Sequence, residues 1–210
     1  MYLSRLKLDT RSPQVRRDLS DSYDMHRTLV RAFVDDPGQT PPRFLWRQEI
    51  TAAWTEPVVM VQSSMAPDWT FLESDGRYLK RDGQEGVEVK HVDEVGLVKD
   101  GRRYRFRLFA NPTVTREGRR LGLRSEESQL AWLARQGTSH GFNVEYAVIT
   151  ASELLRSRAG GREISLQKAC FEGVLQASNA AALCASLKDG IGPGKAFGFG
   201  MLSLVPVKSA

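Results

Sequence analysis

Cysteine, histidine and long apolar stretches are all scarce in this sequence of 210 residues. The two cysteines, Cys170 and Cys184, do not form a C-x-x-C pair, so neither a disulfide framework nor a cysteine-based zinc site is expected. No apolar run approaches the roughly 18 residues of a membrane-spanning helix, and the N-terminus lacks the pattern of a signal peptide. We therefore expect a cytoplasmic protein that does not use a membrane.

Positive charge exceeds negative charge and is concentrated in one stretch. The chain carries a net charge of +5, yet the segment from Leu97 to Arg124 alone holds nine Lys or Arg and two acidic residues. Most of these cations are Arg, whose guanidinium can donate two parallel hydrogen bonds to a phosphate. The stretch predicts a nucleic-acid partner, although a solvated basic face is the alternative. The arginines expected to contact the nucleic acid here are Arg103, Arg105, Arg107, Arg119 and Arg120.

Apolar periodicity and turn residues predict an α+β fold made of two tandem ferredoxin-like (β-α-β-β-α-β) domains with antiparallel sheets. In the first half we expect strands at 2–8, 43–50 and 57–64, a helix at 22–34 and a short helix near Pro67. In the second half we expect strands at 102–112, 142–150, 163–176 and 201–207 and helices at 125–137 and 179–190. The segment 73–96 is polar, punctuated by glycine and rich in acidic residues. We place a linker and edge elements there, between domains at 1–90 and 97–210.

The helix expected at 22–34 combines a buried stripe with reactive side chains. Met25, Leu29 and Phe33 recur every four residues and predict the buried face. Tyr23 and His26 lie close together on the flank of that stripe, and Arg27 follows directly. Such a flank suits either a site that transfers protons or a histidine with a structural hydrogen bond.

Cleavage of RNA by its own 2′-hydroxyl needs a proton acceptor, a proton donor and a positive charge near the phosphate. His26 can serve either proton role at neutral pH, Tyr23 can donate or orient, and Arg27 or Arg31 can stabilise the added negative charge. No cofactor is required for this chemistry. A rival hypothesis takes the aspartates near the start of the helix as ligands of a two-metal nuclease. Helix capping and the helix macrodipole explain these acids better, and we expect no metal. They are Asp18, Asp21 and Asp24.

Two further segments are candidates for ligand contact. The run "GIGPGKAFGFGMLSL" (190–204) matches neither a Walker loop nor a dinucleotide fingerprint, since it precedes a strand and has Ala196 after Lys195. Its backbone is expected to approach a phosphate chain, with a tight structural turn as the alternative. The contacting residues would be Gly192, Gly194, Lys195 and Gly198. The segment 154–165 reads as a hairpin with a basic tip, formed by Arg156, Arg158 and Arg162.

Taken together, these segments resemble the CasE family of CRISPR RNA-processing endoribonucleases from type I-E Cascade complexes. The resemblance covers nearly the whole chain and includes "MYLSRLKL", "YDMHRTL", "RFRLFANP", "QLAWL", "CFEGVL" and the closing glycine-rich run. The order of residues in that closing run is the most specific feature. The spacing Tyr-x-x-His matches the pair found on the first helix of the family.

The resemblance implies tandem ferredoxin-like domains that bind the stem-loop of each CRISPR repeat, within a complex of other Cascade subunits. It also implies metal-independent cleavage on the 3′ side of the stem, which leaves a 2′,3′-cyclic phosphate. Tyr23 and His26 would be catalytic, and some relatives have Lys where this chain has Arg31, which favours charge stabilisation by Arg31 over proton donation. The loop from Arg156 to Arg162 would enter the groove of the stem. The alternative function is a non-catalytic RNA-hairpin-binding subunit.

Overall fold

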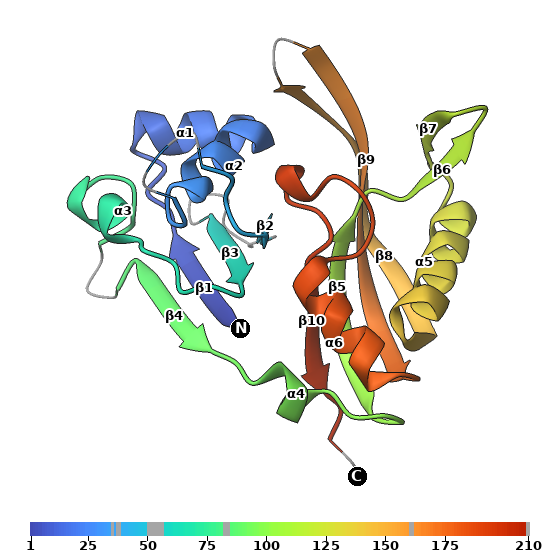
Figure 1. The fold of residues 1–210 in the computed structure, drawn as a ribbon. Coiled ribbons are helices and arrows are strands. Elements are labelled where there is room, and N and C mark those ends of the chain that lie inside the picture. Colours follow the sequence, from blue (N-terminus) through green and yellow to red (C-terminus); the bar gives the residue numbers. More distant parts are fainter. Residues whose placement is uncertain (35, 37–38, 50–56, 82–84, 160–161, 209–210) are drawn as a thin grey trace. The chain divides into compact units, whose positions relative to one another are not determined.

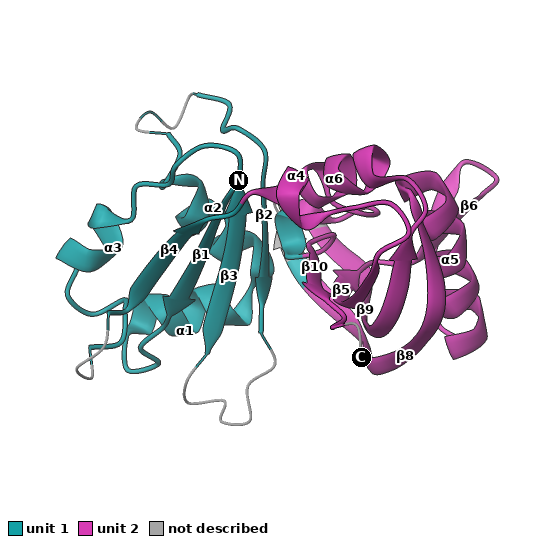
Figure 2. Cartoon of the chain, turned by 90° about the horizontal axis from the view of Figure 1, so that it is seen from below, with its two compact units in different colours: residues 1–92, 157–162, 196–198 teal, residues 93–156, 163–195, 199–210 magenta. Residues whose placement is uncertain are grey.

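A computed structural model of the chain describes residues 1–34, 36, 39–49, 57–81, 85–159 and 162–208 (Figure 1). It divides into two units, which Figure 2 colours separately. Unit 1 contains residues 1–92 together with the short segments 157–162 and 196–198. Unit 2 contains residues 93–156, 163–195 and the chain from Phe199 on. None of the helices within the described residues is both long enough and apolar enough to span a membrane.

Unit 1 is an antiparallel four-stranded sheet with helices packed on one face. Its elements are β1 (Tyr2–Lys7), α1 (Pro13–Ser20), α2 (Ser22–Val30), β2 (Phe44–Gln48), β3 (Val58–Ser63), α3 (Thr70–Ser74) and β4 (Val87–His91). The strand order β2-β3-β1-β4, with its antiparallel pairs, is the ferredoxin-like order. Met25 and Leu29 of α2 are buried in one cluster with Leu6 and Val61 of the sheet. The apolar stripe predicted for this helix therefore faces the core.

Unit 2 repeats the same order with one insertion. Its elements are α4 (Glu94–Leu97), β5 (Arg103–Ala110), β6 (Thr113–Arg116), β7 (Arg119–Gly122), α5 (Glu126–His140), β8 (Phe142–Ala159), β9 (Arg162–Ala177), α6 (Ala180–Asp189) and β10 (Leu202–Pro206), with a short 3-10 turn η1 (Lys195–Phe197) before the last strand. The sheet order is β10-β5-β9-β8. Both halves thus have the ferredoxin-like fold expected from the sequence.

Several predicted boundaries were wrong for local reasons. The helix expected at 22–34 ends at Val30, and a separate helix, α1, precedes it. Ser12 caps α1 and Pro13 opens it, a start signal that the sequence does contain. The helix expected to end at Gly137 continues to His140 and stops at Gly141, which has a positive φ of 76°. Gly137 is needed for packing instead, because a Cβ there would lie 2.6 Å from the carbonyl oxygen of Phe142.

The two-stranded ribbon β6–β7 is an element that the sequence pattern did not predict. Its turn is formed by Glu117 and Gly118, with φ values of 50° and 72°. Positive φ at both central residues is the geometry of a type I′ hairpin, whose usual sequences begin with Asn, Asp or Gly. Glu-Gly is an uncommon sequence for a type I′ turn, so the residues at positions 117 and 118 do not by themselves predict a hairpin. The ribbon holds three of the basic residues of the charged stretch, namely Arg116, Arg119 and Arg120, and all three are exposed.

Candidate functional site: a basic groove along helix α2

The start of α2 is fixed by hydrogen bonds from two directions. Asp21 caps the helix and accepts a hydrogen bond from the backbone N–H of Tyr23 at 2.8 Å. The hydroxyl of Ser157, which belongs to the same unit, donates to the same carboxylate oxygen at 2.6 Å. With Met25 and Leu29 buried, α2 turns its other face outward. The fold therefore presents Tyr23, His26 and Arg27 from the exposed side of a well-anchored helix.

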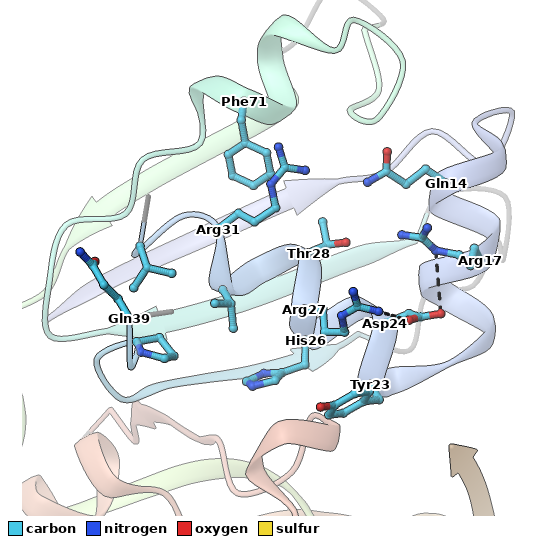
Figure 3. Close-up of a pocket in the computed structure, with 13 residues that line it drawn as sticks. Gln14, Arg17, Tyr23, Asp24, His26, Arg27, Thr28, Arg31, Gln39 and Phe71 are labelled. Atoms are coloured by element: carbon cyan, nitrogen blue, oxygen red, sulfur yellow. Dashed lines mark ion pairs between the residues drawn. The ribbon is translucent and has the colours of Figure 1, made fainter. Parts of the chain in front are cut away.

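These side chains line a groove of about 770 Å³ in unit 1 (Figure 3). The groove is bounded by α1, α2, the segment that follows α2, and Phe71 of α3. Its lining residues are Gln14, Arg17, Tyr23, Asp24, His26, Arg27, Thr28, Val30, Arg31, Val34, Gln39, Pro41 and Phe71. This set contains three arginines and one carboxylate, so the groove has a net positive charge.

His26 is held in an apolar setting. Its ring stacks on Phe44, with 5.1 Å between ring centroids and 18° between planes. Its Nδ1 atom is buried and has no hydrogen-bond partner among the described residues. Burial lowers the pKa of His26 below its ordinary value, because the charged form would lose its hydration. The neutral imidazole, which can accept a proton, is therefore the form favoured at pH 7.

Tyr23 lies one turn before His26. Its ring is 6.1 Å from that of Phe197, which belongs to the glycine-rich segment and to unit 1. Figure 3 shows Tyr23 and His26 on one side of α2, whereas Arg31 points away from them toward Phe71. The three residues expected to be catalytic thus line the same groove, and two of them share one side of the helix.

The three aspartates near α2 are each engaged by protein groups. Asp18 is fully buried and accepts hydrogen bonds from Arg17 and from the hydroxyls of Thr28 and Tyr78. Asp21 is the helix cap described above. Asp24 forms ion pairs with Arg17 at 3.8 Å and Arg27 at 3.5 Å. Within the described part of the chain, no three metal-binding side chains gather into a cluster. Capping, ion pairing and hydrogen bonding account for the positions of these three carboxylates.

The arginines of β5 differ in their surroundings. Arg103 forms a two-pronged pair with Glu145, which raises the pKa of Arg103 through hydrogen bonding and charge. Arg107 pairs with Glu172 at 2.9 Å. Arg105 is exposed and has no carboxylate partner among the described residues. The alternating pattern correctly predicted an outward face, but two of its three arginines are neutralised by neighbouring glutamates.

The hairpin predicted at 154–165 is formed by the ends of β8 and β9. Arg156 is 72% exposed at its side chain and lies 4.0 Å from Glu163. Gly160 and Gly161, which stand between the two strands in the sequence, lie outside the described residues, as do the side chains of Arg158 and Arg162. Ser157, which belongs to unit 1, donates its hydroxyl to the cap residue of α2.

The glycine-rich run is explained largely by its own packing. All five of its glycines, at positions 190, 192, 194, 198 and 200, have positive φ values between 74° and 91°. A Cβ on Gly192 would lie 2.9 Å from the ring of Trp132, and one on Gly198 would lie 3.2 Å from Trp46. Lys195 donates to the carbonyl oxygen of Gly192 at 2.8 Å. These contacts require glycine whether or not the loop also meets a ligand.

Sequence reasoning overlooked several residues of the groove. Gln14 and Arg17 lie on the unpredicted helix α1, and the Ser-Pro pair that opens it was the available signal. Phe44 lay in a predicted strand, but no local pattern pairs it with His26. Phe71 lies 40 residues beyond Arg31, so only the tertiary fold brings them together.

The fold and the groove define a class: a tandem ferredoxin-like protein with a Tyr–His pair on the second helix of its first unit. A model of the CRISPR associated protein family matches residues 1–206. The CRISPR-associated endoribonuclease Cse3 of Thermus thermophilus is 34% identical over 220 residues, covering 98% of this chain and 100% of that protein. The CRISPR system Cascade subunit CasE of Escherichia coli (strain K12) is 38% identical over 224 residues, covering 99% and 100%.

The similarity extends to three dimensions. A solved structure of Thermus thermophilus Cse3, bound to an RNA representing a pre-cleavage complex, matches with a TM-score of 0.84 at 33% identity and covers 98% of each chain. The chain belongs to the CasE/Cse3 family of CRISPR-associated proteins.

Proposed function

We propose that the protein is a metal-independent endoribonuclease that binds the stem-loop of a CRISPR repeat RNA and cleaves it on the 3′ side of the stem. The observation that carries this proposal is His26, kept neutral by burial, beside Tyr23 in a groove lined by three arginines. Similarity to Cse3, which is an endoribonuclease, and to CasE, a Cascade subunit, supports it. The partners are the repeat RNA and other Cascade subunits, and both cysteines are free thiols, in keeping with the cytoplasm.

The chemistry follows from the groups in the groove. The 2′-oxygen attacks the adjacent phosphorus while the bond to the 5′-oxygen breaks, giving a 2′,3′-cyclic phosphate and a 5′-hydroxyl. His26 accepts the proton of the 2′-hydroxyl, because the neutral imidazole has a free lone pair. Tyr23 donates its phenolic proton to the departing 5′-oxygen. Arg27 and Arg31 supply positive charge as negative charge builds on the phosphoryl oxygens.

The RNA stem is held by basic residues outside the groove. The ribbon β6–β7 presents Arg119 and Arg120 to solvent, and neither has a carboxylate partner among the described residues. Arg156 projects from the β8–β9 hairpin, where Arg158 and Arg162 are its neighbours in sequence. We assign the larger share of phosphate contact to these residues and Arg105, and the smaller share to the glutamate-paired Arg103 and Arg107. Gly192, Gly194, Lys195 and Gly198 would meet the RNA through the backbone of their loop.

A direct test incubates the protein with its repeat hairpin in EDTA, beside a matched RNA that carries a 2′-deoxy sugar at the cut site. We expect the first RNA to be cleaved and the second to be bound but to survive, because the attacking hydroxyl is missing. Binding of both without cleavage of either would instead support the non-catalytic RNA-binding subunit. Cleavage that disappears only in EDTA would support a metal nuclease and overturn the proposal.

The lowered pKa of His26 predicts the acidic limb of the pH–rate profile. A base must be unprotonated, so kcat/KM falls as the pH drops through the pKa of His26 in the free enzyme. Because burial places that pKa below 6.5, the half-maximal point of the limb should also lie below pH 6.5. Cleavage measured between about pH 4.5 and 8 with RNA below saturation gives this value. A limb centred at or above pH 6.5 would contradict a His26 pKa lowered by burial, and a profile with no acidic limb would contradict the role of His26 as the base.

A further inference from the structure

The guanidinium of Arg31 is stacked on an aromatic ring. Its Cζ atom lies 4.4 Å from the ring centroid of Phe71, inside the range of a cation–π interaction. Figure 3 shows the Arg31 guanidinium beside the ring of Phe71, the first from the end of α2 and the second from α3. A stack leaves the edge of the guanidinium, with its N–H donors, free to meet another group.

The fold holds Phe71 in place for this contact. The backbone N–H of Asp68 donates to the carbonyl oxygen of Ala32 at 2.9 Å, which ties the start of α3 to the residue after Arg31. The Asp68 carboxylate then accepts hydrogen bonds from the N–H and the hydroxyl of Thr70. The ring of Phe71 packs against the core of unit 1, with Trp69 at 6.4 Å between centroids. Phe71 is thus a partly buried platform rather than a freely rotating side chain.

Arg31 also differs from the other arginines of the groove in its ion pairing. Arg17 is paired with Asp18 and Asp24, and Arg27 is paired with Asp24. Arg31 has no ion-pair partner among the described residues. Its guanidinium is oriented by an uncharged ring, so its positive charge is not cancelled. A guanidinium that is held in one orientation and has no acidic partner is well suited to bind a phosphate group.

We infer that Phe71 is a positioning residue, which holds the Arg31 guanidinium in the groove for a phosphate of the bound RNA. The inference rests on the proposed function and deepens it. Arg31 alone has several flexible bonds and would sample many positions. Stacking restricts the guanidinium before RNA arrives and so reduces the entropy lost when it meets the phosphate. A lysine at position 31 would lose the flat stacking surface, so Arg31 and Phe71 act as a pair.

A double-mutant cycle tests this pairing. Phe71→Leu should lower the single-turnover cleavage rate constant at saturating protein by about three- to tenfold, the worth of one cation–π contact. Phe71→Tyr should restore the rate, because it restores the ring. In an Arg31→Ala background, Phe71→Leu should cause no further loss, since the ring would have nothing left to position. Tyr2→Leu is the matched control, because Tyr2 is another partly exposed aromatic of unit 1 that does not line the groove.

Two outcomes would overturn the inference. One is a Phe71→Leu rate equal to that of the unmodified protein. The other is an equal loss from Phe71→Leu with and without Arg31, which would mean that the ring acts through general stability. A thermal unfolding measurement on each variant checks that it is folded at the temperature of the cleavage assay. His26→Ala, assayed in parallel, separates this result from the proposed function: if that variant cleaves normally, the proposed function itself fails.

Discussion

His26→Ala is expected to lower the single-turnover cleavage rate constant by about 10³-fold and to leave the Kd for the repeat hairpin within about twofold. The substitution removes the proton acceptor, and general acid–base catalysis by one positioned side chain is typically worth between about 10²- and 10⁴-fold. Binding should persist because the neutral, half-buried imidazole contributes no charge to phosphate contact. The measurement is cleavage with protein in excess over RNA, paired with a binding titration in the same buffer.

His91→Ala is the matched control for this prediction. His91 lies on β4 of the same unit, is exposed, and packs edge-on against Tyr2 outside the groove. The His91→Ala variant should cleave the repeat RNA at the same rate as the unmodified protein. If His26→Ala and His91→Ala both cleaved normally, the assignment of His26 as a proton acceptor would be wrong. A parallel loss of binding and cleavage in His26→Ala would instead mean that the histidine supports the shape of the groove.

The placement of Tyr23 and His26 beside each other could be predicted from sequence because both residues lie on one helix. The spacing of Met25 and Leu29 set the buried face of α2, and the positions of Tyr23 and His26 relative to that face followed from helix geometry. The same reasoning predicted the fold of each half, since two β-α-β-β-α-β runs admit few topologies. Local periodicity is sufficient to predict which side chains lie together when the residues are only a few positions apart in the sequence.

The rest of the groove depends on contacts between distant residues. No sequence pattern links Arg31 to Phe71, or Ser157 to Asp21, because the first pair is 40 residues apart and the second 136. Charge reasoning also did not show that Glu145 and Glu172 form ion pairs with two of the β5 arginines. The sequence shows how many charges a segment carries, whereas the fold decides which of them remain available to a phosphate.

Asp18→Ala is expected to reduce the free energy of unfolding by about 3 kcal/mol. The carboxylate is fully buried and accepts from Arg17 at 2.8 Å, from the Thr28 hydroxyl at 2.6 Å and from the Tyr78 hydroxyl at 2.8 Å. Removing it leaves both buried hydroxyls without their acceptor. Burial, aided by the Asp18 carboxylate, raises the pKa of Tyr78, so its hydroxyl stays protonated and needs an acceptor.

Equilibrium unfolding in urea at pH 7 measures this loss, and Asp24→Ala is its control. Asp24 is also an aspartate paired with Arg17, but its side chain is 31% exposed and its ion pairs are 3.5 and 3.8 Å long. Exposed pairs of this kind contribute between about 0 and 1 kcal/mol, so the control should lose far less stability. Equal losses would show that the buried carboxylate does not hold α1 and α2 together. A larger loss from Asp18→Ala would show that this buried carboxylate, through its hydrogen bonds to Thr28 and Tyr78, stabilises the unit that carries His26.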